Sequence, residues 1–427
     1  MKEQYKNIQE FIDDLKKESV KMTIIDMGYL TEDDFIGHKT KCVFHRENDP
    51  SLQITDSFFK CYGGCGAKGD IIKFVQLYDD ITFLEAIEKL AKHFNATIKD
   101  SSISNYTKIQ SKLKKEWDGY VEAFNQAVKE GTDHSKKIME MGKRYFPHIV
   151  GYDKEIDYIV LPFTSKTGGI LGFTKRIILD EKIQPPHYPK WRHSNLKDSL
   201  ISNCHNIFNL GMAYKHIKET CEVHIVEGPG DVAAMQRAKF LNTIALCGVG
   251  NFSDKVLEIL YPLKRIFLVM DGDNAGRKAL KTDIKAIMSL NHDLIEETYV
   301  VPMREGEDPG ILSAKEIAER KDNSQPALIW FIQNSNDTEI RDLYSKCDSQ
   351  ILRPKIINLV AKNMNFTIDQ SREWLRAQKT NEKIGDREYY SRLLATIGMN
   401  KDISIQALDM TEEQAKRILH LRFKEKY

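Results

Sequence analysis

The sequence contains no apolar run that approaches the roughly 20 residues of a transmembrane helix, so we expect no membrane partner. Its first residues, MKEQYKNIQEFIDDLKK, are charged throughout and do not have the apolar region of a secretory signal. Cysteine is scarce and odd in number, with seven in 427 residues, so a disulfide framework is not indicated. These absences favour a reducing, cytoplasmic compartment.

Neither sign of charge dominates, because 63 basic and 62 acidic residues leave a formal net charge of +1. Global charge therefore does not indicate a nucleic-acid partner, and any binding face must come from local clustering of charge. The G-x-x-x-x-G-K-[ST] loop is absent, which excludes a P-loop helicase within these residues. With 41% apolar and 29% charged residues, the chain has the composition of a folded protein of two or three domains.

Short apolar runs rich in Val, Ile and Leu recur between helical stretches in the middle of the chain. They lie at Val223–Val226, 243–247, Arg265–Met270 and Thr298–Val301, each bounded by Gly or a charge. Such runs are typical of strands that are buried on both faces of a parallel sheet with helical crossovers. The sequence therefore predicts an α/β core in this region.

Acidic residues follow these predicted strands. Glu227 ends the first, Asp271 and Asp273 end the third, and Asp308 follows the fourth. The carboxyl ends of parallel strands meet at one edge, where open α/β sheets place their ligands. Carboxylates brought together repel one another unless cations lie among them, and hard oxygen ligands select Mg²⁺ or Mn²⁺. We therefore expect two or more divalent ions and phosphoryl-transfer chemistry; the alternative is that Asp-Gly-Asp is only a polar turn.

A second set of candidate ligands lies near the N-terminus. Cys42 and His45 are two residues apart, and Cys61 and Cys65 lie in a Gly-rich knuckle after a predicted hairpin, 52–60. This spacing predicts one tetrahedral Cys3His structural zinc site, with His38 as a reserve ligand. The alternative is three free thiols and a surface histidine. The nearby aromatic residues either stack on the bases of a single strand or form the core of the ribbon; they are Phe44, Phe58, Phe59 and Tyr62.

The remaining segments are mostly helical. We expect a helix from about residue 8, an extended segment at Met22–Ile25, a flexible linker at 96–105, and helices over 106–150 and beyond residue 313. The sequence predicts two strands, at residues 157–163 and 170–173, joined by a hairpin turn.

A basic segment follows this hairpin. Lys175, Arg176 and Lys190 are its principal cations, and they suit a phosphate backbone or a triphosphate. The alternative is a solvated basic loop.

The acidic motifs resemble those of the TOPRIM module, which topoisomerases share with DnaG-type primases. The matching segments are Glu227–Asp231, Asp271–Gly276 and Glu307–Pro309, with Ala245–Gly250 similar to the Gly-containing turn between them. The Cys/His segment resembles the zinc ribbon of DnaG-type primases, and the basic segment resembles two of their basic motifs.

The match to the ribbon has two departures. Val43 stands in place of the usual Pro, and three residues instead of two separate Cys61 from Cys65.

The resemblance predicts an α+β multidomain protein. An N-terminal zinc ribbon, a basic β-containing subdomain, a central α/β TOPRIM core and a C-terminal helical region are expected at residues 1–100, 101–215, 216–325 and 326–427. The short tail favours a shortened, phage-type primase.

The resemblance implies a DNA primase, a nucleotidyltransferase that makes short RNA primers on single-stranded DNA from ribonucleoside triphosphates, with a separate replicative helicase as partner. Asp271, Asp273 and Asp308 would hold the divalent ions, and Glu227 would be a metal ligand or would handle the hydroxyl proton. Asp231 would be a supporting carboxylate, and the basic side chains would contact template or nucleotide. Rival hypotheses are a TOPRIM nuclease or topoisomerase-like enzyme, and a non-catalytic nucleic-acid-binding relative.

Overall fold

The fold is of the α+β class predicted from the sequence. The computed structural model describes residues 1–45, 47–63, 65–79, 81–99, 101–178, 190–194, 199–200, 207–247, 252–260 and 263–376. The chain divides into two units, Met1–Leu359 and Val360–Tyr427. The basic segment continues beyond Lys190 and also contains Lys182 and Lys197, which lie outside the described residues. Residues 248–250 of the Gly-containing turn lie outside them as well.

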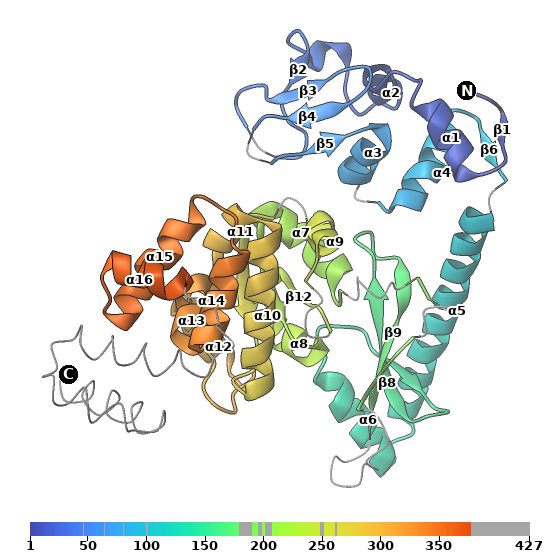
Figure 1. Ribbon diagram of the computed structural model, residues 1–427. Coiled ribbons are helices and arrows are strands. Elements are labelled where there is room, and N and C mark those ends of the chain that lie inside the picture. The colour runs from blue at the N-terminus through green and yellow to red at the C-terminus, as the bar shows by residue number, and fades with distance from the viewer. Residues whose placement is uncertain are drawn as a thin grey trace, which may run out of the picture. The chain divides into compact units, whose positions relative to one another are not determined.

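The part of the chain up to residue 99 combines short helices with a sheet of strand order β2-β3-β4-β5 (Figure 1). Its elements are β1 (Gln4–Tyr5), α1 (Ile8–Leu15), α2 (Val20–Asp26), η1 (Glu32–Asp34), β2 (Lys39–Thr40), β3 (Leu52–Ile54), β4 (Phe59–Cys61), β5 (Lys68–Gly69), α3 (Ile71–Asp79), α4 (Phe83–His93) and β6 (Thr97–Ile98). The predicted hairpin is confirmed as β3–β4, with Ile54 opposite Phe59.

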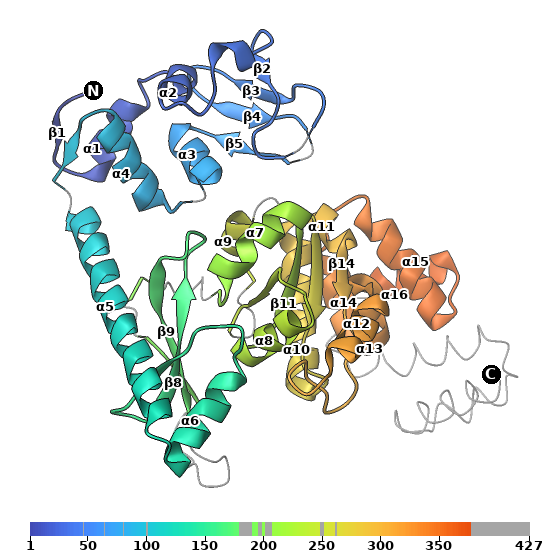
Figure 2. The same ribbon diagram turned by 180° about the vertical axis from the view of Figure 1, so that it is seen from behind.

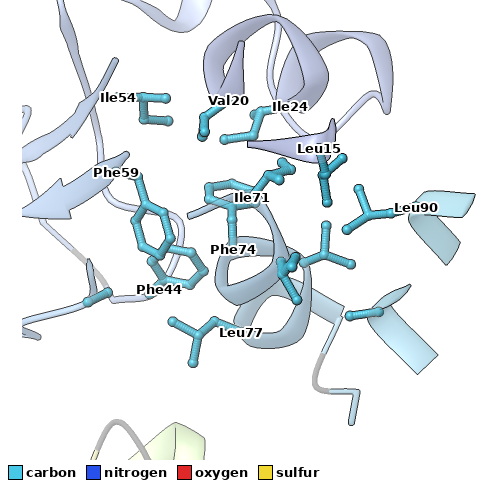
Figure 3. Close-up of a cluster of buried hydrophobic side chains, with 14 of the residues drawn as sticks. Leu15, Val20, Ile24, Phe44, Ile54, Phe59, Ile71, Phe74, Leu77 and Leu90 are labelled. Carbon is cyan, nitrogen blue, oxygen red and sulfur yellow. The ribbon is translucent and has the colours of Figure 1, made fainter. Parts of the chain in front are cut away.

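This part has its own hydrophobic core. Phe44, Phe59 and Phe74 pack with ring centroids 5.3–5.6 Å apart, and aliphatic side chains from α1, α2 and α4 surround them (Figure 3). The core therefore joins the Cys/His segment to the helices before and after it.

Two expectations about local structure are wrong here. Met22–Ile25 is not extended, because Ser19 caps α2 by accepting a hydrogen bond from the Met22 amide at 3.2 Å. The predicted linker at 96–105 is also structured: β6 pairs in parallel with β1, and α5 (Ser101–Lys129) begins at Ser101.

Residues 101–193 form a helical pair packed on an antiparallel sheet of order β10-β9-β8-β7. The elements are α5, α6 (Asp133–Lys143), β7 (Gly151–Asp153), β8 (Tyr158–Thr164), β9 (Ile170–Ile177) and β10 (Trp191–His193). Figure 1 and Figure 2 both show the long α5 alongside β8 and β9. The two predicted strands and their hairpin turn are confirmed as β8, β9 and residues 165–169.

The predicted parallel sheet is confirmed, with strand order β12-β11-β13-β14-β15. Four strands are parallel and β15 is an antiparallel edge. Every residue of β12 is buried, and β11 and β13 are buried beyond their first residue, which explains why they are continuous apolar runs. The elements are α7 (Leu210–Thr220), β11 (Glu222–Val226), α8 (Pro229–Arg237), β12 (Thr243–Ala245), α9 (Asp254–Leu260), β13 (Arg265–Val269), α10 (Asn274–Leu290), α11 (His292–Glu296), β14 (Thr298–Val300) and β15 (Gln325–Pro326).

The C-terminal part of the described chain is helical, as predicted. It comprises α12 (Ala314–Asp322), α13 (Ala327–Asn334), α14 (Asp337–Lys346), α15 (Leu352–Met364) and α16 (Ile368–Arg376). Two ion pairs hold α14 on α10, Lys281–Glu339 at 2.7 Å and Lys285–Asp342 at 2.8 Å. None of the described helices combines the length and apolar character needed to cross a membrane.

Candidate active site

The predicted acids converge at the carboxyl edge of the parallel sheet. β11 and β13 are neighbours, with Val226 opposite Val269, so the residues that follow these strands start side by side. The Glu227 carboxylate accepts a hydrogen bond from the backbone amide of Asp271 at 3.0 Å. Asp273 is the N-cap of α10, where its side chain accepts from the Gly276 amide. The strand ends therefore bring three of the four predicted metal ligands to one place.

The fourth acid, Asp308, is brought in by the loop after β14. The amide of Gly272 donates to the carbonyl oxygen of Glu307 at 2.8 Å, which ties this loop to the Asp-Gly-Asp turn. A Cβ atom at Gly310 would lie 2.8 Å from Asp308 Oδ1 and 3.9 Å from Asp231 Oδ1. Both carboxylates therefore face the same small space beside Gly310.

Asp231 is a full member of the cluster, although the sequence indicated only a supporting role. It lies in the first turn of α8, where its side chain accepts from the Gly228 amide at 3.1 Å. The Asp308 and Glu227 carboxylates are both within electrostatic range of it. The signal in the sequence was its spacing of four residues from Glu227, which places both at the start of one strand-to-helix connection.

The electrostatics of the cluster favour a bound cation. Burial, followed by repulsion from neighbouring carboxylates, raises the pKa of Asp231 to about 7 and that of Asp271 to about 8. Burial and the charges of Asp273 and Asp308 also raise the pKa of Glu227. Within the described part of the chain, Asp271 Oδ1 is buried and has no hydrogen-bond partner. Oxygen donors in this arrangement fit hard divalent ions, which would remove the repulsion.

Among the described residues, the compact set of candidate metal ligands is Cys42, His45, Cys61 and Cys65, whose ligand atoms lie within 4.8 Å of one another. The acids are not part of such a set. Mg²⁺ usually keeps several waters and shares substrate phosphates, so it does not require a closed set of protein ligands.

A network that sequence reasoning missed holds the Asp308 loop in place. Glu307 pairs with Arg320 of α12 at 2.7 Å, and its carboxylate also accepts from the Arg304 amide. Arg277 of α10 donates to the Gly272 carbonyl oxygen and pairs with Glu305, both at 2.8 Å. These contacts position the turn and the loop relative to each other, and no local spacing in the sequence indicates them.

Two glycines make this close approach possible. A Cβ on Gly272 would lie 1.7 Å from the carbonyl oxygen of Arg304, and one on Gly276 would lie 2.1 Å from that of Asp271. Glycine is required at both positions because backbone packs directly on backbone there.

A further acid, Asp283, is buried on α10 and was also missed. It is 4% exposed, and its Oδ1 has no hydrogen-bond partner among the described residues. Burial, followed by the charge of Glu227, raises the pKa of Asp283 to about 7. Its place within the apolar periodicity of α10, between Leu280 and Ile284, was the available signal.

We expect Asp283→Asn to stabilise the protein, increasingly so with rising pH. A raised folded-state pKa means that the stability of the wild type is greatest below the unfolded pKa of about 3.8 and falls as pH rises toward 7. The gain at pH 8 should be about 1–4 kcal/mol. Urea unfolding at pH 5, 6, 7 and 8 measures it, with Asp322→Asn, an exposed acid of α12, as control. A constant difference between variant and wild type over this range would contradict the assignment.

The second ligand set forms a compact cluster. Cys42 Sγ lies 3.6 Å from Cys65 Sγ, and Cys61 Sγ lies 3.9 Å from His45 Nδ1. These separations match the spacing of ligands around a tetrahedral Cys3His site, so the residues fit a structural metal ion. His38 is exposed and is not a member of the cluster.

Two of the aromatic residues near this cluster belong to the core of the ribbon, and two are exposed and could stack on nucleic-acid bases. Phe44 and Phe59 are buried in the core. Phe58 and Tyr62 are 40% and 57% exposed, and the ammonium groups of Lys39 and Lys60 lie within 5.8 and 4.6 Å of the Tyr62 ring. The exposed pair is therefore available to a partner.

The three predicted phosphate-contacting cations lie in different environments. Lys175 faces α5, where it pairs with Asp153 at 2.8 Å and donates to the Tyr120 hydroxyl. Arg176 is next along β9 and so points to the opposite face, where it is 4% exposed and lies over the Trp191 ring. Lys190 is exposed and immediately precedes β10.

Arg176 is on the side of the acids. The hydroxyl of Tyr145 lies within electrostatic range of both Arg176 and Asp231, and burial raises its pKa to about 12. The structure therefore brings Arg176 near the acidic cluster, whereas Lys175 is engaged on the other face of the sheet.

Comparisons with known proteins agree with this geometry. Residues 7–106 match the family model described as the CHC2 zinc finger, and residues 222–294 match the model described as the Toprim domain. The chain is 29% identical over 335 residues to the DNA primase of Aquifex aeolicus, covering 70% of this chain and 65% of that protein. It is 24% identical over 417 residues to the DNA primase of Pseudomonas putida, covering 82% and 60%. The chain thus spans less than two thirds of the length of either relative.

Two solved structures have a similar fold. The crystal structure of the zinc-binding and RNA polymerase domains of Aquifex aeolicus primase aligns with a TM-score of 0.51 and 24% identity, covering 86% of this chain and 98% of that chain. The RNA polymerase domain of Mycobacterium tuberculosis primase DnaG aligns with a TM-score of 0.50 and 16% identity, covering 60% and 98%.

The fold and the two sites define a protein that combines a zinc ribbon with a TOPRIM core. The resemblance to DnaG-type primases is thereby confirmed: the chain contains the zinc finger and the Toprim domain that the two family models describe, and it is similar to bacterial DNA primases.

Proposed function

We propose that the protein is a DNA primase that synthesises short RNA primers on single-stranded DNA. One observation carries the proposal: five carboxylates meet at the carboxyl edge of the parallel sheet. They are Glu227, Asp231, Asp271, Asp273 and Asp308. The zinc ribbon and the basic segment, which precede this site in the order found in DnaG-type primases, support it.

The acids supply the binding site for divalent cations. Asp271, Asp273 and Asp308 would hold the ions, and Mg²⁺ is the expected one. When bound, such ions neutralise triphosphate charge and stabilise the attacking and leaving oxygens of an in-line displacement. Glu227 is held against the Asp271 amide, where it serves as a further ligand or accepts the proton of the primer 3′-hydroxyl. Asp231 would add a further carboxylate charge to the cluster, and a high negative charge favours a divalent ion over a monovalent one.

Basic and aromatic side chains would hold the nucleic acid and the nucleotide. Arg176 and Lys190 are proposed to contact phosphate, and Lys175 is proposed to support β9 through its pair with Asp153 in addition to any phosphate contact. On the ribbon, Tyr62 and Phe58 would stack on template bases. The expected domain boundaries at residues 100, 215 and 325 and a separate helicase partner belong to the same proposal.

A primer-synthesis assay tests this function. Labelled ribonucleotides, Mg²⁺ and random single-stranded DNA are incubated with the protein, and the products are separated by size. Short RNA products that require template, ribonucleotides and metal together would support a primase. Cleavage of the template with metal alone would instead indicate a TOPRIM nuclease, and template binding without either reaction would indicate a non-catalytic relative.

We expect the purified protein to contain about one zinc ion per chain, held by the Cys3His cluster. Cys61→Ser should lower the zinc content and unfold the ribbon, because structural zinc contributes roughly 10 kcal/mol or more to folding. Metal analysis of the dialysed protein measures this, with Cys221→Ser as the control because Cys221 lies outside the cluster. A wild-type zinc content near zero would refute the site.

We expect binding of single-stranded DNA to weaken as salt concentration rises, with Lys190 contributing one phosphate contact. Lys190→Gln should lower the slope of log affinity against log salt by about 0.7, the value for one neutralised phosphate on a single strand. Fluorescence anisotropy at salt concentrations from about 50 to about 300 mM measures the slope for the wild type and for the variant. Lys315→Gln, on an exposed position of α12, should leave the slope unchanged; equal slopes for both variants and the wild type would favour a solvated basic loop.

A further inference from the structure

The Cys/His cluster has an acidic neighbour that neither the spacing nor the family resemblance assigns. Glu47 lies between the two knuckles, and its side chain is largely buried, at 12% exposed. One carboxylate oxygen accepts from the amides of Cys42 at 2.6 Å and Ser51 at 3.0 Å. The other accepts from the Ser51 hydroxyl and lies 3.0 Å from His45 Nε2. Glu47 therefore links the backbone of the first knuckle to one ring nitrogen of the histidine.

The orientation of the His45 ring follows from this contact. Nε2 points to Glu47, while Nδ1 points toward the sulfur atoms and lies 3.9 Å from Cys61 Sγ. A carboxylate can only accept a hydrogen bond, so Nε2 must carry the proton in the metal-bound state. Nδ1 is then left with the free lone pair, which is the form a metal ligand needs.

The unusual second knuckle of this chain packs against the same pair. Three residues separate Cys61 from Cys65, and the amide of Gly63 donates to Cys61 Sγ at 3.2 Å. A Cβ on Gly63 would lie 2.6 Å from Ser51 Oγ and 3.0 Å from both Glu47 Oε2 and His45 Nε2. A side chain at this position would therefore crowd the Glu47–His45 contact, and glycine leaves room for it.

We propose that Glu47 is a positioning residue for the metal: it selects Nδ1 of His45 as the ligand atom and holds the first knuckle in its binding geometry. Gly63 provides the space that this contact requires in a knuckle with three intervening residues. The inference rests on the proposal that the cluster holds zinc, and it is independent of whether the TOPRIM acids catalyse primer synthesis.

Zinc affinity of the full chain tests the proposal. Competition between the protein and a chromophoric zinc chelator gives the dissociation constant for the wild type and for Glu47→Gln, Glu47→Ala and Gly63→Ala. Loss of an outer carboxylate partner typically weakens metal binding about 10–100-fold, and we expect Glu47→Ala in that range. Glu47→Gln should lie between Glu47→Ala and the wild type, because its amide oxygen can still accept from the backbone. Glu32→Gln, an exposed acid of the same part of the chain, is the matched control and should bind as the wild type does.

The position of the proton on His45 gives a second readout. A purely structural role of Glu47 would not change which ring nitrogen carries this proton. Nitrogen-15 NMR of the zinc-loaded protein distinguishes metal on Nδ1 from metal on Nε2. We expect Nδ1 ligation in the wild type, and loss of the slowly exchanging Nε2 proton in Glu47→Ala. Metal on Nε2 in the wild type would overturn the proposal even if a variant fails to fold.

The outcomes separate this inference from the zinc assignment and from the proposed primer synthesis. Zinc affinities within twofold of the wild type for both Glu47 variants would overturn it while leaving the zinc site intact. A wild-type chain that binds no zinc would overturn both the zinc assignment and this inference. Primer synthesis is not used as a readout, so failure of the proposed polymerase activity would appear only in the separate assay.

Discussion

Replacing Asp271 with asparagine should reduce primer synthesis by roughly a thousandfold or more, equivalent to about 4 kcal/mol of transition-state stabilisation. Asp271 lies within electrostatic range of the other four acids, and its buried Oδ1 has no partner among the described residues. The substitution removes a charged oxygen donor for the divalent ion and keeps the size of the side chain. Its backbone amide still donates to Glu227, so the strand ends should keep their arrangement.

The assay for this variant is primer synthesis under saturating metal, together with Mn²⁺ binding followed by electron paramagnetic resonance. Asp322→Asn, on the exposed end of α12, is the matched control and should retain wild-type rates. Thermal unfolding checks the fold of both proteins. Wild-type synthesis by a folded Asp271→Asn variant would remove the acidic cluster as the site of chemistry.

Gly272→Ala should have the second largest effect, a loss of activity of at least about a hundredfold, although it changes no charged group. The new methyl group would lie 1.7 Å from the carbonyl oxygen of Arg304, and neither partner is a flexible side-chain end. The Asp-Gly-Asp turn and the loop that carries Asp308 must therefore separate. A shift of about 1 Å between catalytic groups costs on the order of 10² in rate.

Gly230→Ala is the matched control for this prediction. Gly230 is also next to a cluster acid, Asp231, but no described atom lies within 4 Å of the position that its Cβ would take. Alanine in α8 should be neutral or slightly stabilising, because it favours helix more than glycine does. Measuring kcat, the Mn²⁺ dissociation constant and the unfolding midpoint for both variants separates displacement of the loop from general destabilisation. Equal activities for the two variants would show that contact between turn and loop does not position Asp308.

Some errors made from the sequence have local causes. The cap at Ser19 was not recognised, so Met22–Ile25 was expected to be extended. The Ser-rich stretch after residue 96 was expected to be a linker because polar composition does not distinguish an exposed helix from a flexible segment. In both cases the apolar pattern was too short or too weak to decide between helix and coil.

Sequence alone was sufficient to predict the Cys/His cluster, the parallel sheet and the position of the acids at its edge. Strands buried on both faces are continuous apolar runs, and polar residues reappear where these strands end. The sequence therefore places Glu227, Asp271 and Asp273 at one edge of the sheet. The Cys3His cluster was equally accessible, because a tight turn brings close residues to one ion. These features depend on spacing within a few residues, which a sequence displays directly.

Only the tertiary structure decided which neighbours support those ligands. It placed Arg176 on the face of β9 toward the acids and Lys175 on the face toward α5, and it showed that Asp231 belongs to the cluster. It also revealed the contacts of Glu47 with His45 and of Glu307 with Arg320, and the buried Asp283. Such relationships depend on how a side chain is turned and on what packs against it from distant segments, and neither is encoded in the spacing of residues along the chain.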